Sequence, residues 1–284
     1  MKLSQTGIAV AVAVLVVTAS GCGLVNRIRA KNELNEAART YREGHFDEAE
    51  QHSRRALELD PDNKTAPSFI ARTIHAQFRP GVQSPENIAK ANEAIAAYQQ
   101  ILQKDPKNEE AYKAIAYLYE ATHENDKLRS WISARANDSS IDAEKRAEAY
   151  IVLASKDWDC SFKITELPAN KTTTLNEGNR ASVSYKKPSD AKEFETAQGC
   201  VKRGLEEIEN AIKNDPNSES AWSYKTNLLL EAMKLAEMDG KTDVKAELDK
   251  QREVAQKRTN VLSEANQKKK EEEEKKAEEA AKKK

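Results

Sequence analysis

The feature that most constrains the fold is an Asp-Pro pair that recurs along the chain. It occurs at Asp60-Pro61, Asp105-Pro106 and Asp215-Pro216, each time at the end of an amphipathic segment and two residues before an Asn or Ser. Proline lacks the amide proton and its ring clashes with the preceding turn, so a helix must end there. A helix that ends in the same way several times indicates an internal repeat, and repeats built from helix pairs are typical of a solenoid.

The stretch from Asn32 to Asn63 contains one complete repeat. Apolar and small residues recur at a spacing of three and four, which places them on one helical face, and the pattern is interrupted once, at Gly44-His45. The face is formed by Leu34, Ala37, Ala38 and Tyr41 before the interruption and by Phe46, Ala49, Ala56 and Leu57 after it. This pattern predicts two amphipathic helices joined by a tight turn.

These residues resemble the tetratricopeptide repeat family. Its helix-packing and helix-ending positions are occupied here by Ala37, Tyr41, Gly44, Phe46, Ala49, Ala56 and Pro61. The resemblance implies an all-α fold, a right-handed α-solenoid of about five helical hairpins over residues 32–266. Further units are expected at Phe69–Leu102, Ala111–Ile132, Ala147–Ile212 and Trp222–Leu262. The alternative is an ordinary helical bundle, which obeys the same packing rules.

One stretch departs from the helical period. Cys160–Thr165 and Ala181–Lys186 alternate polar and apolar residues, and a period of two predicts β-strands. We therefore expect a small β-hairpin-like insert at about residues 157–189. An isolated two-stranded hairpin is marginally stable in water, so a covalent link near its base would support it.

The first residues indicate an export signal. A single lysine precedes an apolar run, Ile8–Val17, which is shorter than the ~20 residues needed to span a bilayer and is followed by small residues. Ala19-Ser20-Gly21-Cys22 is similar to a bacterial lipobox, which implies a signal peptide over residues 1–21, diacylglycerol and palmitate on Cys22, and a basic tether over residues 22–31. An ordinary signal peptide with an incidental cysteine is the alternative.

The lipobox resemblance also implies a location. Gly23 stands where inner-membrane lipoproteins of this kind carry aspartate, which favours the outer membrane. We therefore expect a lipid-anchored protein of the bacterial cell envelope with its solenoid in the periplasm.

The remaining cysteines form an even set. The chain has three cysteines, and if Cys22 carries lipid, Cys160 and Cys200 are left to pair outside the cytosol. Closing a loop of this size stabilises the fold by roughly 4 kcal/mol at most in the chain-entropy model. Two unrelated buried thiols are the alternative.

Composition argues against several classes of function. Charged residues make up 33% of the chain and nearly balance, with a net charge of −1, so there is no strong field to attract nucleic acid. Glycine is scarce, and none of the four histidines has a second histidine or cysteine at metal-ligand spacing. We expect no catalytic residues, no metal, no cofactor and no small-molecule substrate. Residues 267–284 are almost only Lys, Glu and Ala, and predict a solvated, fraying helix.

The family resemblance implies a groove. In tetratricopeptide repeats the first helices of successive hairpins line a concave surface that takes peptide segments or partner helices. The positions carried over from the family are Tyr41 and Arg42, beside Leu34 and Ala38, then Arg72 and His75, Lys113 and Tyr117, and Asn227. Leu34 and Ala38 stand where chaperone-tail adaptors need lysine and asparagine, so that subclass does not fit.

Two functions remain. The first is an envelope scaffold that binds other envelope proteins as part of an assembly, secretion, pilus or outer-membrane machine. The second is an accessory or carrier subunit for a cell-wall hydrolase that supplies the chemistry in trans. Neither requires the chain to be an enzyme.

Overall fold

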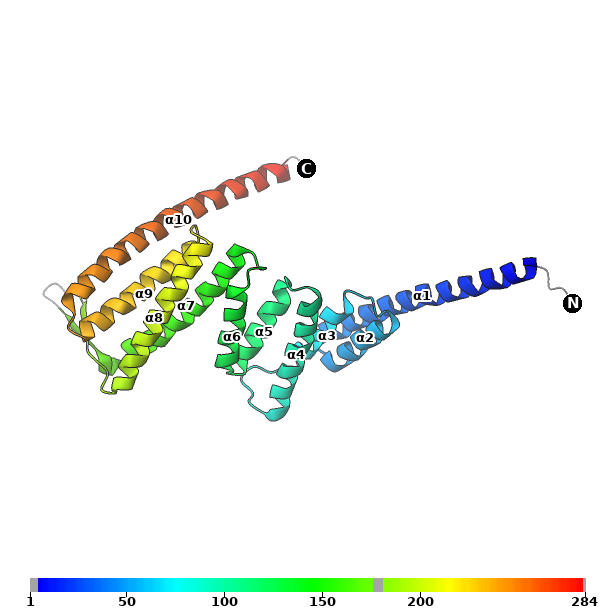
Figure 1. The fold of residues 1–284 in the computed structure, drawn as a ribbon, viewed down its shortest axis with the longest axis horizontal. Helices are drawn as coiled ribbons and strands as arrows, with labels where there is room; N and C mark the ends of the chain where they lie inside the picture. Colours follow the sequence, from blue (N-terminus) through cyan, green and yellow to red (C-terminus); the bar gives the residue numbers. More distant parts are fainter. Residues whose placement is uncertain (1–4, 176–180, 283–284) are drawn as a thin grey trace. The chain divides into compact units, whose positions relative to one another are not determined.

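The computed structural model describes residues 5–175 and 181–282, with side chains described from residue 23 onward. The chain divides into two compact units, Met1–Leu128 and Arg129–Lys284. Figure 1 labels the helices of both units. Within the described residues the structure is helical except for one short 3-10 helix, a two-stranded sheet and the connecting turns. This is the all-α fold with a small β insert that the sequence predicts.

In the first unit consecutive helices pack against one another, from α1 on α2 through to α4 on α5. The helices are α1 (Gln5–Arg42), α2 (Phe46–Leu59), α3 (Ala66–Gln77), α4 (Pro85–Lys104) and α5 (Glu109–Ala121). The boundary between the units falls within α6 (Asn125–Asn137).

In the second unit α7 packs on α8, α8 on α9 and α9 on α10, and α7 also contacts α9. The elements are α7 (Ala143–Thr165), the 3-10 helix η1 (Pro168–Asn170), β1 (Lys171–Leu175), β2 (Ala181–Tyr185), α8 (Ala191–Asn214), α9 (Glu219–Met238) and α10 (Thr242–Lys282). The two strands are antiparallel, with Lys171 opposite Tyr185 and Leu175 opposite Ala181.

The Asp-Pro pairs make the same connection each time. The aspartate amide donates the last hydrogen bond of its helix, at 2.8–3.0 Å, and the residue two positions after the proline donates its own amide to the aspartate carbonyl. The side-chain oxygen of that residue then accepts an amide of the next helix. These capping residues are Asn63, Asn108 and Ser218. The motif thus ends one helix and caps the next, which is why it repeats.

Small residues let the helices of the first unit approach closely. Ala30 on α1, Ala56 on α2 and Ala66 on α3 are fully buried against one another, and leucines from α1 and α2 cover the cluster. Gly44 closes the α1–α2 turn with a φ of +83°, a left-handed conformation that glycine adopts without strain. The alanine-rich composition therefore produces a thin core between paired helices.

The structure corrects the predicted start of the insert. Residues 160–165 form the end of α7 rather than a strand, so the insert between α7 and α8 begins at residue 166 and its first strand is β1. The helix was hidden because its buried stripe is polar. Asp157, Ser161 and Thr165 follow one another at helical spacing and are at most 2% exposed.

The two terminal segments are helical. Residues 23–31, predicted to be a basic tether, belong to α1, and α10 continues as a helix to Lys282. All described side chains from residue 263 onward are exposed, so this helix is solvated as expected. The expected lipidation site, Cys22, lies outside the residues whose side chains are described.

Candidate functional site

A pocket of about 420 Å³ opens between four helices of the first unit. We call it the aromatic pocket. It is lined by Tyr41 from α1, by Arg72, His75 and Ala76 from α3, by Phe78 and Pro80 from the loop that follows, by Tyr98 from α4, and by Glu110, Ala114 and Tyr117 from α5. The pocket forms where α1, α3 and α5, the first helices of successive hairpins, lie near one another. Tyr98 of α4 contributes the remaining helical side of the lining.

His75 lies among the tyrosines of this pocket. Its ring centroid is 5.8 Å from that of Tyr98 in an edge arrangement and 5.6 Å from that of Tyr117 in a tilted one. Its Nδ1 is 3.3 Å from the Tyr98 hydroxyl. Burial lowers the pKa of His75, and burial chiefly raises the pKa of Tyr98 to about 12. Both side chains are therefore neutral at pH 7, and this part of the pocket is aromatic and uncharged.

The charge of the pocket sits on an exposed ion pair. Arg72 Nε lies 3.4 Å from Glu110 Oε1, and the two side chains are 50% and 61% exposed. Exposed pairs of this kind contribute only about 0–1 kcal/mol. A ligand carboxylate can therefore displace Glu110 from Arg72 at little expense, so the pocket offers an apolar aromatic surface with one exchangeable cation.

The structure brings four of the seven predicted groove residues into this one pocket. They are Tyr41, Arg72, His75 and Tyr117. The others are elsewhere: Arg42 and Lys113 are exposed but do not line the pocket, and Asn227 is half-buried on α9 in the second unit.

The sequence-based prediction missed Tyr98, Phe78 and Glu110. It considered only the first helices of the repeats and assigned the second helices to packing. The sequence did contain a signal for Tyr98, which is the one residue with a polar group on an otherwise apolar face over residues 91–98. A buried phenolic hydroxyl needs a hydrogen-bond partner, so a tyrosine at this position indicates a polar neighbour.

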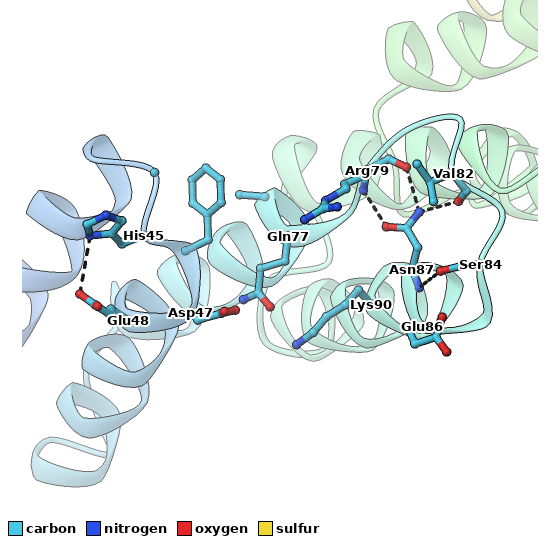
Figure 2. Close-up of a pocket in the computed structure, with 13 residues that line it drawn as sticks. His45, Asp47, Glu48, Gln77, Arg79, Val82, Ser84, Glu86, Asn87 and Lys90 are labelled. Atoms are coloured by element: carbon cyan, nitrogen blue, oxygen red, sulfur yellow. Dashed lines mark hydrogen bonds and ion pairs between the residues drawn. The ribbon is translucent and has the colours of Figure 1, made fainter.

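A second, larger pocket of about 830 Å³ lies in the same unit, at the starts of α2 and α4 (Figure 2). Asn87 shapes it. The Asn87 side-chain amide donates to the carbonyls of Arg79 and Val82 at 2.8 and 2.7 Å and accepts the Arg79 amide at 2.8 Å, while its backbone amide bonds Ser84 Oγ (Figure 2). Asn87 therefore holds the lengthened α3–α4 turn through backbone groups of Arg79 and Val82 and the Ser84 hydroxyl.

In the second unit a disulfide joins α7 to α8. Cys160 and Cys200 are bonded, with their Cα atoms 6.1 Å apart and a separation of 40 positions in sequence. Arg203 Nη2 lies 3.2 Å from the Cys200 sulfur and also bonds Asp157 at 2.9 Å. The predicted pairing is thus present in the structure. Its α7 partner, Cys160, lies near the end of that helix, shortly before the insert begins.

A buried carboxylate links α7 to α9. Glu231 is 1% exposed and accepts the hydroxyls of Ser161 and Thr165 at 3.0 and 2.8 Å and the Lys234 ammonium at 2.6 Å. Lys234 also bonds Glu166, at 2.7 Å. Ser161 and Thr165, two of the three residues in the polar stripe at the end of α7, are therefore satisfied by α9.

The same network holds the base of the insert. Glu166 accepts the Tyr185 hydroxyl at 3.0 Å and the Lys171 ammonium at 2.6 Å, and Glu237 accepts the Tyr185 amide at 2.9 Å. Partial burial acts to raise the pKa of Glu166, but the bonds from Lys171, Lys234 and Tyr185 together outweigh it and lower the pKa to about 2. The β-hairpin is thus fastened by the ionised side chain of Glu166, directly after α7, and by those of Lys234 and Glu237 on α9.

Two kinds of site are absent from the part of the chain that the structure describes. No group of three or more His, Cys, Asp or Glu side chains there is placed to hold a metal ion. None of its helices is both long and apolar enough to span a membrane.

Comparison with known proteins gives one short family match. The model of the "Protein prenyltransferase alpha subunit repeat" matches residues 201–232, which run from α8 through the Asp215-Pro216 turn into α9. That repeat is named after an enzyme subunit, and the matched segment is a single helix–turn–helix. No curated protein matches the sequence.

Several solved structures resemble the chain distantly. They include the MamA RS-1 ArsTM double mutant, with a TM-score of 0.40 and 12% identity over 84% of this chain and 96% of that one. MamA 41-end from Desulfovibrio magneticus RS-1 has a TM-score of 0.37 and 12% identity over 81% and 96%. A tetratricopeptide repeat protein from Parabacteroides merdae ATCC 43184 has a TM-score of 0.34 and 14% identity over 83% and 99%. At these values they transfer no partner, ligand or activity to this chain.

Proposed function

We propose that this protein is a non-catalytic scaffold of the bacterial cell envelope that binds partner proteins through segments inserted in the aromatic pocket. A lipid on Cys22 anchors it at the outer membrane, with the helical repeats in the periplasm. The observation that carries the proposal is the aromatic pocket itself, which combines residues from four helices into a surface suited to a side chain rather than to a reaction.

The lining indicates the kind of segment that fits. Rings of Tyr98, Tyr117 and His75 offer apolar faces and edges to an aliphatic or aromatic side chain. Arg72, once released from Glu110, offers a planar fork to a carboxylate. We expect a partner segment that presents one large apolar residue near an acidic one.

A charge-matched pair of variants tests the pocket. Arg72→Glu should weaken capture of the partner, because it places a second acid beside Glu110. Lys113→Glu, a reversal of the same size on an exposed residue outside the lining, should leave capture unchanged. Capture is measured by co-purification from membranes after crosslinking through a photoreactive residue at Tyr117. Equal loss in both variants, or in neither, would contradict a role for the pocket.

The anchor is tested separately. Cys22→Ser should release the protein from membranes washed with carbonate, since the lipid attachment is lost. Retention of the variant after the wash would mean that another segment holds the protein. Because this assay does not measure capture, its result is independent of the pocket variants.

A further inference from the structure

The first turns of α1 with described side chains expose an apolar face. Leu24, Val25 and Ile28 are 64%, 47% and 56% exposed, whereas Ala30, two residues later, is completely buried. Ala30 is the first buried residue in the described part of α1, where the helix meets α2 and α3. Three apolar side chains therefore precede the point at which the helix joins its unit.

These side chains lie together on the helix. At 100° per residue, Leu24, Val25 and Ile28 fall within one sector, and Ala30 falls roughly on the opposite side. The apolar face thus points away from the hairpin, so no neighbouring helix of the first unit covers it. The sequence-based prediction of a basic tether did not identify this face.

Cations flank the face and no acid interrupts it. Residues 23–31 contain Arg27, Arg29 and Lys31 and no Asp or Glu. Arg27 is 69% exposed, and its Nε is 3.9 Å from Asp60 Oδ1, a loose contact at most. On the helix wheel Arg27 and Arg29 stand on either side of the apolar sector, where long side chains extend outward from an apolar surface.

We infer that residues 23–31 of α1 form an interfacial helix whose Leu24–Val25–Ile28 face lies in the headgroup region of an anionic bilayer. An exposed apolar strip flanked by arginine or lysine is the pattern of helices that lie at membrane surfaces, where anionic lipids attract the cations. A protein partner fits less well, because three side chains on two turns are a small patch beside the roughly 1,000 Å² that a stable interface needs.

This inference rests on the proposed anchor at Cys22. Residue 22 immediately precedes the segment, so a lipid there would hold the face against the bilayer. Because α1 is one continuous helix, it would also carry Tyr41 of the aromatic pocket at a fixed position, about 25 Å along the helix axis from Leu24. The lipid would then be attached to one end of a continuous helix, and not to a flexible linker.

The test measures membrane depth in the full chain, processed in cells and reconstituted into vesicles of phosphatidylethanolamine and phosphatidylglycerol. An environment-sensitive fluorophore is attached at Leu24→Cys or Ile28→Cys. Val254→Cys and Val261→Cys on α10 are matched controls, because these valines are 63% and 56% exposed. Quenchers on the upper acyl chains should quench the labels on α1 at least about threefold more than the labels on α10.

The outcomes separate the inference from the anchor. Equal, weak quenching at all four positions in protein that floats with the vesicles overturns the inference and leaves the anchor intact. Protein that does not float overturns both. A disulfide between two copies through Ile28→Cys, with an unquenched label, would assign the face to a second copy instead. Reduced quenching in Arg27→Gln/Arg29→Gln supports the inference.

Discussion

The buried carboxylate of Glu231 allows a quantitative test of how the second unit is held together. Replacing Glu231 by Ala removes the acceptor of the Ser161 and Thr165 hydroxyls, both from residues that are 0% exposed, and one of the two carboxylates that bind Lys234. The variant therefore loses interactions at three positions while leaving the helices and the disulfide in place.

The magnitude follows from what each partner retains. A buried donor left without an acceptor costs about 1–3 kcal/mol. Thr165 Oγ1 can still reach the Phe162 carbonyl, at 3.4 Å, and Lys234 keeps Glu166 at 2.7 Å. The low end of the range, about 1 kcal/mol, therefore applies to Thr165, and the middle of the range, about 2 kcal/mol, applies to Ser161. We expect Glu231→Ala to lower the free energy of unfolding by about 3 kcal/mol, at the lower edge of the 3–5 kcal/mol typical of an uncompensated buried charge.

Urea unfolding followed by circular dichroism measures this change. Glu231→Gln keeps an acceptor oxygen without the charge and should lose about half as much. Glu278→Ala, on the fully exposed end of α10, is the matched control and should change stability by less than about 0.5 kcal/mol. A Glu231→Ala variant as stable as the Glu278→Ala variant would refute the reasoning, because the buried network would then contribute nothing.

Three further predictions follow from single features. Replacing both Cys160 and Cys200 by Ser should lower the free energy of unfolding by up to about 4 kcal/mol in the chain-entropy model; melts of oxidised wild type and the double variant measure it, and equal midpoints would contradict it. Because burial lowers the pKa of His75, the unfolded state binds its proton first, so stability should fall as pH drops below about 6.5; melts from pH 7.5 to 5 should show a shallower fall in His75→Gln, and identical slopes would refute the assignment. Ala56→Asp would bury a charge among packed helices and cost several kcal/mol, whereas Ala277→Asp on the exposed tail should be neutral in the same melts, so equal stability of the two variants would count against the packing described.

Local chemistry made most of the helical fold predictable from the sequence. A proline cannot continue a helix, and an Asn or Ser three residues after the aspartate caps the next one, so the ends of α2, α4 and α8 follow from a few adjacent residues. The spacing of apolar residues likewise predicted the helices whose buried face is apolar. The number of cysteines predicted the disulfide. These signals require no knowledge of what lies across the core.

Tertiary contacts decided the rest. The end of α7 buries Asp157, Ser161 and Thr165, and such a polar stripe is stable because partners on α6, α8 and α9 satisfy it, so the apolar period could not reveal it. The aromatic pocket likewise needs Tyr98 beside His75, two residues that are 23 positions apart and come together because α4 packs on α3. A local pattern specifies where a helix starts and ends, but which side chains it buries depends on the partner that it meets.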